Sequence, residues 1–341
     1  MLRMNLVNTV IYYLRNKATY IMVAAFVIGI LMLYLRAQND LYSPSLFLFK
    51  AIFFPLSLVL LIKTWLFAFL VTKTRKGNNY RKWPAGVALF LTLLFLPHLL
   101  PNWQQSPQFS EIANQQGFSV ATFSAMTRSR NASDIKKFIQ AYQPEVLCLQ
   151  EVNVEDMQAL SGLYPFHHRH GESNLVILSK FPLKEVVKNQ ERQQPLNNLI
   201  INSLQSIELI MPGERRINIL NVHMPRQYRV DGNFAKTLKS IQSHTETDKP
   251  IIFCGDFNMT PQHTFYSHLT QQLGLSDAQL SQTWEYGFTF PNANRNLARF
   301  GTWVRIDYLF SRGFYHGNTK VVNVSNLSDH QAVLSKFSLA K

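Results

Sequence analysis

The first hundred residues contain three long runs in which nearly every position is apolar. The runs cover residues 18–35, 51–71 and 83–100, and Lys63 is their one Lys, Arg, Asp or Glu. A membrane crossing takes about 20 apolar residues, with about 17 as the lower limit. Buried helices of soluble proteins are seldom apolar all round three times in succession, and a cleaved signal peptide would not precede two further runs. The pattern predicts three transmembrane helices.

From residue 118 onward, short apolar runs alternate with stretches that have the spacing of a helix. Ile135, Phe138, Ile139 and Tyr142 repeat at i, i+3, i+4 and i+7 and predict an amphipathic helix. Further helices are expected at residues 231–242 and 262–272. Asp231 is the expected N-cap of the first of these. Strands are predicted at residues 118–123, 145–150, 175–178, 207–210, 217–222, 251–254, 304–310 and 332–337.

The order of these elements predicts the fold class. Pro212 and Gly213 separate two of the strands and indicate a hairpin. Alternating strands and helices with a hairpin among them predict an α/β protein, a four-layer sandwich of two mixed β-sheets flanked by helices. We expect it at residues 118–341, preceded by a membrane region at 1–100 and a linker at 101–117 that is rich in Gln, Pro and Ser.

The charges predict how the chain is oriented. Residues 1–117 hold 11 Lys and Arg against 2 acids, and the rest of the chain holds 23 against 18. Basic residues precede the first apolar run and fill the loop at residues 73–82, whereas residues 101–117 have none. Because cytoplasmic loops are enriched in Lys and Arg, we expect the N-terminus inside and everything after residue 100 outside. In a bacterium this describes an inner-membrane protein, and in a eukaryote the soluble domain would be lumenal.

The sequence contains two cysteines, Cys148 and Cys254, each inside an apolar strand just before a polar motif. Two central strands seldom present the geometry that a disulfide requires. We therefore expect buried free thiols, with a disulfide as the less favoured alternative.

Five apolar strands end in a carboxylate, an amide or an imidazole. Their motifs are CLQEV at 148–152, NVH at 221–223, GDFN at 255–258, RIDY at 305–308 and SDH at 328–330. Asp and Asn are ordinary turn residues, so one such motif is weak evidence. A hard cation such as Mg²⁺ takes a few carboxylates and keeps other positions for water and substrate phosphate. Five motifs together predict a site that hydrolyses a phosphate ester with Mg²⁺ or Mn²⁺.

Three residues of these motifs are candidates for binding the metal and the phosphate. Glu151 is the candidate metal ligand, and the alternative is an acid at the start of a helix. Asp256 and Asn258 lie two residues apart and project to the same side of an extended turn. One could bind metal or orient the attacking water while the other donates to a phosphate oxygen. The alternative is an Asx turn that caps the following helix.

Two histidines are candidates for the site, and three others are expected at the surface. His330 follows Asp329, and Asp307 supplies a second carboxylate, so the imidazole has what a general base needs to fix its tautomer. His223 could do complementary work near the leaving oxygen. The crowded histidines at positions 167, 168 and 170 have no clear acid or thiol partner and are expected to be surface residues rather than a zinc site.

The ordered set CLQEV, NVH, GDFN, RIDYLF and SDH resembles the endonuclease/exonuclease/phosphatase superfamily, over about residues 118–337. The stretch NLVILSKFP at 174–182 is similar to a further family segment. The resemblance implies a catalytic domain in which Glu151 is the principal metal ligand and Asp329 contributes. It also implies that Asp256 and Asn258 position nucleophile and phosphate, that His223 binds the phosphate or assists the leaving group and that Asp307 supports His330. It leaves the identity of the base open.

One position departs from the family pattern. Family members usually carry Asn at the end of the first strand, where this chain has Ser124. A hydroxyl lacks the reach and the second donor of an amide. The substitution is expected to weaken metal binding or to leave another group in that role.

Three functions follow. The first is a membrane-anchored phosphodiesterase or phosphatase that acts outside the cytoplasm, on a substrate such as a lipid headgroup. The second is an extracytoplasmic nuclease, in which Arg226, Tyr228 and Arg229 track a nucleic-acid backbone; these residues otherwise form a solvated loop. The third is a catalytically weak module that binds phosphorylated ligands. The six polar groups retained at strand ends favour an enzyme.

Overall fold

The computed structural model describes most of the chain in two compact units, residues 1–100 and 101–341. The described residues are 17–38, 44–74, 83–100, 108–125, 132–169, 174–185, 204–225, 233–245, 249–281, 286–292, 298–299, 301–324 and 328–340.

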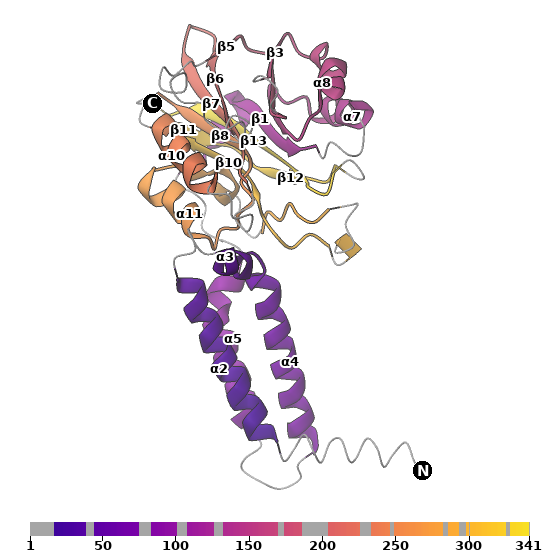
Figure 1. Cartoon of the computed structure of the whole chain (residues 1–341), viewed down its shortest axis with the longest axis vertical. Helices are drawn as coiled ribbons and strands as arrows, with labels where there is room; N and C mark the ends of the chain where they lie inside the picture. Colours follow the sequence, from indigo (N-terminus) through magenta and orange to yellow (C-terminus); the bar gives the residue numbers. More distant parts are fainter. Residues whose placement is uncertain are drawn as a thin grey trace. The chain divides into compact units, whose positions relative to one another are not determined.

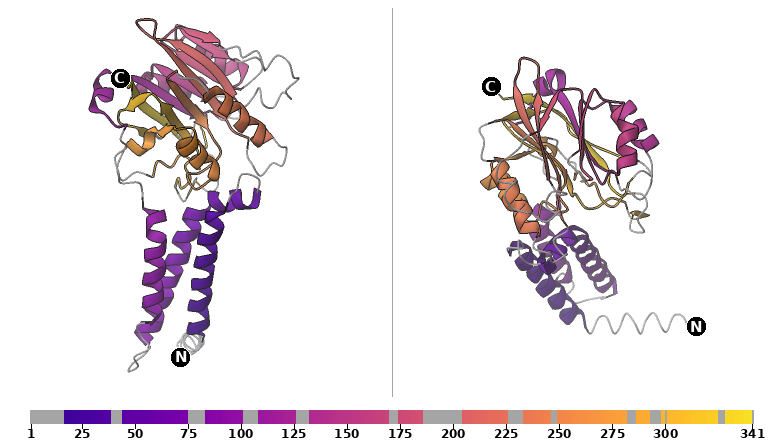
Figure 2. Two further views of the ribbon diagram at one scale, coloured as in Figure 1. Left: turned by 90° about the vertical axis from the view of Figure 1, so that its left-hand side faces the viewer. Right: turned by 45° about the horizontal axis from the view of Figure 1, so that its top comes forward.

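The first unit is a bundle of apolar helices (Figures 1 and 2). Its helices are α2 (Ala18–Ala37), α3 (Pro44–Ala51), α4 (Phe53–Thr74) and α5 (Trp83–Leu99). Phe53, Leu91 and Phe95 are fully buried at the centre. A Cβ on Gly29 would lie 2.7 Å from the Leu91 side chain, so the glycine lets α2 and α5 pack closely.

Two of these helices are long and apolar enough to cross a membrane, Ala18–Ala37 and Phe53–Val71. The third predicted span forms a helix of 17 residues, Trp83–Leu99. At 1.5 Å per residue it is about 25 Å long, short of the roughly 30 Å of a hydrocarbon core. Length and composition alone are weak evidence, because a buried helix or a signal sequence passes the same test. Three crossings therefore remain a prediction.

The second unit contains two mixed β-sheets. The seven-stranded sheet has the order β11-β13-β1-β2-β4-β3, with β12 also paired to β13, and the six-stranded sheet has the order β5-β6-β7-β8-β10-β9. The strands of the first sheet are β1 (Phe118–Ser124), β2 (Val146–Gln150), β3 (Phe166–Arg169), β4 (Val176–Ser179), β11 (Phe314–His316), β12 (Lys320–Val322) and β13 (Ala332–Leu339). Those of the second are β5 (Leu183–Glu185), β6 (Leu204–Ile210), β7 (Arg216–His223), β8 (Ile251–Asp256), β9 (Ser276–Asp277) and β10 (Asp307–Arg312).

The sheets pack face to face and helices cover their outer faces (Figure 1). Between the sheets, apolar side chains of both interdigitate, among them Val120, Ile219 and Leu309. On the outer face of the seven-stranded sheet lie α7 (Ala132–Tyr142) and α8 (Val154–Ser161), which bury Phe138 and Leu160. The other outer face carries α10 (Asn233–Thr245) and α11 (Thr264–Ser267), which continues into the π-helical turn His268–Gln272. The predicted α/β architecture of two mixed sheets flanked by helices is confirmed.

Local details follow the sequence in most places. The predicted hairpin joins β6 and β7 across Pro212 and Gly213, where Met211 N donates to Arg215 O (2.8 Å). Within the segment expected to be a linker, Glu111–Gln116 forms α6, because the Ser110 side chain accepts from Ile112 N and caps its first turn. Asp231, the expected N-cap of α10, lies outside the described residues.

The expectation of free thiols is wrong, because Cys148 and Cys254 form a disulfide. The two residues lie on strands of different sheets, β2 and β8, and both point into the space between the sheets. Their Cα atoms are 6.2 Å apart, within the range of about 4.4–6.8 Å that a disulfide spans. The prediction failed because two central strands of different sheets can face each other, and here the packing of the sheets brings the two side chains together.

Candidate active site

The strand register explains why residues far apart in the sequence meet at one edge. β1 and β2 are parallel in one sheet and β7 and β8 in the other, and a hydrogen bond between Gln150 and Asn221 joins the ends of β2 and β7, so all four end on the same side. β10 runs antiparallel to β8 and β13 antiparallel to β1, so both begin there. Asp256 is paired with His223 on one side and with Asp307 on the other. The five polar motifs therefore converge on one end of the sandwich.

The backbone adopts an uncommon conformation with positive φ at three of these positions. Glu151 has φ = 57° and Asn258 has φ = 49°, left-handed conformations that non-glycine residues seldom adopt. Gly255 has φ = 149°, and a Cβ there would lie 1.9 Å from the carbonyl oxygen of Val222, so only glycine fits. Uncommon backbone of this kind is typical of functional sites, where the surrounding structure supports it.

A hydrogen-bonded pair forms the buried floor of the site. His330 Nδ1–H donates to Asp307, at 2.9 Å from Oδ2 and 3.1 Å from Oδ1. Asp307 is fully buried and His330 is 3% exposed. The bond fixes the imidazole so that Nε2 faces the other carboxylates, 3.9 Å from Asp256 Oδ2 and 4.0 Å from Asp329 Oδ1.

The charges of this cluster shift both its acids and its bases. Burial alone would lower the pKa of His330, but Asp307, Asp256 and Asp329 raise it to about 10. Burial raises the pKa of Asp256 to about 7, against the opposing charge of His330. In the metal-free protein the surroundings thus favour the imidazolium form of His330 and the protonated form of Asp256.

Glu151 and His223 form the more open side of the site. His223 Nε2 lies 3.7 Å from Glu151 Oε1 and 3.7 Å from Asp256 Oδ2. The Glu151 side chain is 33% exposed and that of His223 is 25% exposed, whereas Asp256 and Asp329 are buried. A ligand would therefore enter past Glu151 and His223 and meet Asp256 and His330 at the bottom.

Asn258 is oriented by its neighbours. Its backbone N–H donates to Asp256 Oδ1 (2.8 Å), which is the Asx turn considered as an alternative. Its Nδ2 donates to Met224 O (2.8 Å) and to Asp256 Oδ2 (3.3 Å). In this arrangement the amide steers the Asp256 carboxylate, and the predicted donation of its hydrogens to a phosphate would require these bonds to break.

The donor set fits a divalent metal. Asp256, Asp307 and His330 have ligand atoms that all lie within 4.8 Å of one another, a possible metal-binding group. Asp307 and His330 are already joined by their hydrogen bond, however, which leaves Asp256 as the carboxylate of the three that is not hydrogen-bonded to the imidazole. Glu151, close enough to Asp256 to affect its charge and one third exposed to solvent, supplies the oxygen ligand that a hard cation prefers. Glu151 and Asp329 remain the predicted ligands.

A layer of buried amides separates the site from the apolar core. Gln150 Nε2 donates to Asn221 Oδ1 (2.7 Å) and to Thr122 Oγ1 (3.1 Å). Asn221 Nδ2 donates to Leu149 O (2.9 Å) and Gln205 Oε1 (3.2 Å). The motifs contained Gln150 and Asn221, but the sequence did not show that both point inward and join the two sheets just below Glu151 and His223.

The structure places three of the remaining candidates and leaves the others outside the described residues. His167 and His168 are on β3, where Gln205 Nε2 lies 2.8 Å from His168 Nδ1. Ser124 is buried at the end of β1, and its carbonyl oxygen accepts from Ser328 Oγ (2.6 Å). His170, Arg226, Tyr228 and Arg229 lie outside the part of the chain that the structure describes.

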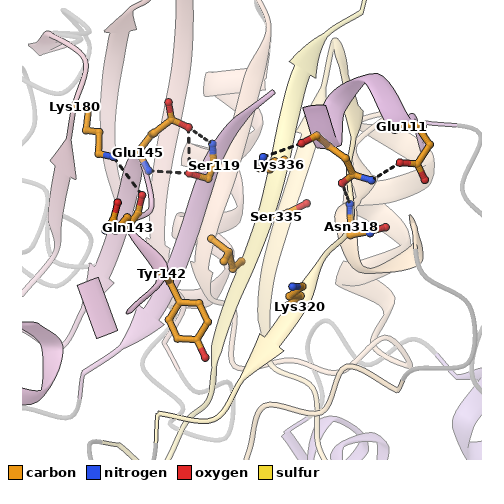
Figure 3. Close-up of a pocket in the computed structure, with 12 residues that line it drawn as sticks. Glu111, Ser119, Tyr142, Gln143, Glu145, Lys180, Asn318, Lys320, Ser335 and Lys336 are labelled. Carbon is orange, nitrogen blue, oxygen red and sulfur yellow. Dashed lines mark hydrogen bonds between the residues drawn. The ribbon is translucent and has the colours of Figure 1, made fainter. Parts of the chain in front are cut away.

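A cavity of about 690 Å³ lies at the other end of β1 and β2 (Figure 3). Its acids are held by neighbours: Glu145 accepts from Ser119 N (2.7 Å), and Glu111 accepts from Asn114 Nδ2 (2.9 Å). None of the motif carboxylates or imidazoles lines it, so we assign it no part in the chemistry.

The fold and the site together define a class: an α/β sandwich of the phosphoesterase and nuclease type, with carboxylates and imidazoles gathered at one edge. The sequence matches the endonuclease/exonuclease/phosphatase family over residues 113–330, and the chain belongs to that family. The resemblance seen in the motifs is thus confirmed. No curated protein matches the sequence.

Solved structures agree with this assignment. The chain is similar to an endonuclease/exonuclease/phosphatase from Bacteroides vulgatus, with a TM-score of 0.51 and 17% identity over 66% of this chain and 100% of that one. It is also similar to the 3′ phosphatase NExo from Neisseria bound to a product DNA hairpin, with a TM-score of 0.50 and 14% identity over 65% of this chain and 99% of that one. At these identities the likeness establishes a shared fold.

Proposed function

We propose that this protein is a membrane-anchored, divalent-metal-dependent phosphoesterase that hydrolyses its substrate outside the cytoplasm. One observation carries the proposal: six ionisable side chains from five separate motifs form a continuous cluster. The contacts between them run from 2.9 to 4.0 Å and join Glu151, His223, Asp256, Asp307, Asp329 and His330. Chance turn residues would have no reason to converge in this way.

Glu151 and Asp329 would hold Mg²⁺ or Mn²⁺. A bound cation supplies positive charge to a phosphate oxygen and acidifies a water molecule. The family to which the chain belongs generally consists of phosphoesterase and nuclease hydrolases, which supports this chemistry.

The chain's own residues would share the remaining work. His330 is held by Asp307 with Nε2 turned toward the site, so its protonated form can donate to a phosphoryl oxygen and stabilise the negative charge that develops there. Asp256, whose pKa of about 7 lies near the operating pH, is suited to take a proton from the attacking water. His223, on the open side, would assist the leaving oxygen, and Asn258 would orient Asp256.

The extracytoplasmic location has two independent supports. The basic loop at residues 73–82 favours the cytoplasm, which places residues after 100 on the other side. The disulfide between Cys148 and Cys254 adds to this, because disulfides persist in oxidising compartments and are rare in the cytosol. The apolar helices α2, α4 and α5 would provide the anchor, because an odd number of crossings is needed to place the N-terminus and the soluble unit on opposite sides.

A lipid headgroup is the substrate class we favour. A tethered domain meets a membrane substrate at high effective concentration, so the anchor would raise turnover without any new contact. A nuclease of the same fold is the alternative, supported by the excess of 23 basic over 18 acidic residues after residue 117. The binding-module alternative is disfavoured, because the strained backbone at Glu151 and Asn258 would not persist without a use.

The test is hydrolysis of bis-p-nitrophenyl phosphate by the full-length protein in detergent, with Mg²⁺, with Mn²⁺ and with EDTA. We expect metal-dependent release of p-nitrophenol that is lost in Glu151→Ala. No turnover of this diester, or of a p-nitrophenyl monoester, by folded protein would overturn the proposal. Headgroup release from phospholipid or sphingolipid vesicles, compared with cleavage of plasmid DNA, then decides between the lipid and nuclease versions.

A further inference from the structure

An irregular segment, Gly287 to Asn292, contacts both halves of the Asp307–His330 pair. Asp307 begins β10 in the six-stranded sheet, whereas His330 lies just before β13 in the seven-stranded sheet. Their hydrogen bond therefore spans two sheets, and each partner must be held in place independently of the other. No motif in the sequence drew attention to this segment.

Thr289 holds the Asp307 side of the pair. Its side chain is fully buried, and its Oγ1 accepts from Ile306 N (3.2 Å) and from Asp307 N (3.3 Å). The neighbouring strand β9 pairs only with Phe310 and Ser311 of β10, so it ends before Asp307. The hydroxyl thus takes the place of a strand at the point where the β10 backbone presents the catalytic carboxylate.

The same segment holds the His330 side. Gln331 N donates to Thr289 O (2.8 Å), and Asn292 N donates to Asp329 O. Asn292 Nδ2 lies 3.3 Å from Ser328 O and 3.3 Å from His330 O, so one buried amide contacts the backbone before and after Asp329. The Phe290 ring lies against the His330 imidazole, with ring centroids 5.1 Å apart.

We propose that Thr289 and Asn292 are positioning residues of the active site, which set the Asp307–His330 hydrogen bond by holding its two partners from one continuous segment. The inference depends on the proposed function for its catalytic consequence, although the positioning itself is a property of the structure. Outer contacts of this kind matter because a displacement of a fraction of an ångström weakens a hydrogen bond that must form in the transition state.

The kinetic test uses three variants and bis-p-nitrophenyl phosphate. Thr289→Val removes the hydroxyl at nearly constant volume, and Asn292→Ala removes the amide. We expect each to lower kcat by about 10- to 100-fold, the usual range for outer partners of a site, with KM changed by less than about 3-fold. Thr289→Ser keeps the hydroxyl and should restore kcat to within about 3-fold of the wild type.

Thr319→Val is the matched control. Thr319 is also a buried threonine with two side-chain hydrogen bonds, but it lies outside the active site: its Oγ1 donates to Ala278 O (2.7 Å) and lies 2.9 Å from the Ser335 hydroxyl, from which it can accept. Its loss should lower Tm about as much as Thr289→Val while kcat stays within about 2-fold of the wild type. If Thr319→Val lowered kcat as much as Thr289→Val, the effect would be general destabilisation and the proposal would be overturned.

A second readout does not require turnover. In nitrogen-15 histidine-labelled, metal-free protein, the Nδ1–H proton of His330 should give a downfield NMR resonance from its bond to Asp307. The resonance should move upfield or broaden in Thr289→Val and Asn292→Ala and stay in place in Thr319→Val. An unchanged resonance in both site variants would overturn the positioning role. A wild type that shows this resonance and hydrolyses no phosphate ester would instead overturn the proposed function.

Discussion

The two ends of the space between the sheets are equally buried and chemically opposite. At one end Val146, Ile217 and Ile252 are fully buried among other apolar side chains. At the other, Gln150, Asn221 and Asp307 are just as buried, yet each is polar. The same strands supply both ends, because β2, β7 and β8 change from apolar to polar within their last residues. Burial therefore stabilises one end and creates the chemistry of the other.

This contrast has an energetic consequence. Burying an amide or a carboxylate is unfavourable unless it is hydrogen-bonded, and the layer of Gln150, Asn221 and Thr122 meets that condition. Asp256 meets it less completely, since burial raises its pKa to about 7 in spite of a neighbouring imidazolium. The hydrogen-bonded amides thus stabilise the polar end, whereas the Asp256 carboxylate would be stabilised further by a positively charged ligand.

The largest expected effect is at the polar end. Asp256→Asn keeps the shape of the side chain but removes the carboxylate, and kcat should fall by about 10²- to 10⁴-fold, the usual worth of a positioned acid or base. Turnover of bis-p-nitrophenyl phosphate under saturating Mg²⁺ measures it. A variant with near wild-type kcat would show that Asp256 has no catalytic part.

The same variant should make the metal-free protein more stable. Because the folded pKa of Asp256 is raised above its unfolded value, the folded state binds the extra proton, and stability falls as pH rises from about 4 to 7. Asn carries no such penalty, so the gain in Tm should be small at pH 4 and full above pH 7. Thermal unfolding in EDTA across this range tests the sign, and a lower Tm at pH 8 would contradict it.

At the apolar end the effects should be reversed. Ile252→Ala removes a fully buried side chain and should lower the free energy of unfolding by about 2–5 kcal/mol. Well below the melting temperature, kcat should stay close to that of the wild type. Urea unfolding and turnover measured on the same sample separate stability from kcat. A large loss of kcat in the folded variant would contradict the assignment of catalysis to the polar end alone.

The disulfide marks the boundary between the ends. It lies two residues before Gln150 on β2 and two before Asp256 on β8, and it closes a loop of 106 residues. Replacing both cysteines with Ala should lower stability by about 2–4 kcal/mol, with a smaller effect on kcat. Unchanged thermal unfolding of the double variant, or of protein treated with dithiothreitol, would argue against the bond and against the oxidising compartment.

The smallest effect is expected far from the site. Glu208 is buried, which alone would raise its pKa, but its hydrogen bonds and charge contacts with Lys249 and Arg216 lower it. A lowered carboxyl pKa stabilises above its unfolded value near 4.5 and loses that contribution as pH falls through the folded pKa. Because both partners are half exposed, Glu208→Gln should lower stability by about 1 kcal/mol or less at pH 7 and by nothing near pH 3.

The sequence predicted the features that follow from local patterns and missed those that depend on contacts between distant segments. Apolar strands with polar ends revealed both the sheets and the positions of Glu151, Asp256 and His330, because strand period and turn chemistry are local. The pairing of Cys148 with Cys254 depends on which sheets face each other, and no local pattern contains that. Thr289 and Asn292 lie on an irregular segment without periodicity, and their role emerges only once β10 and residues 328–331 are placed beside it.

The most direct test of the polar end is calorimetric titration of Mn²⁺ into metal-free, full-length protein in detergent, with Glu151→Gln as the comparison. The substitution keeps the size of the side chain and removes its charge, and circular dichroism would verify that the fold is retained. We predict saturable binding to the wild type that is weakened at least about 10-fold in Glu151→Gln. Binding of equal strength in both proteins, or none in either, would contradict the assignment of this edge as a metal-dependent site.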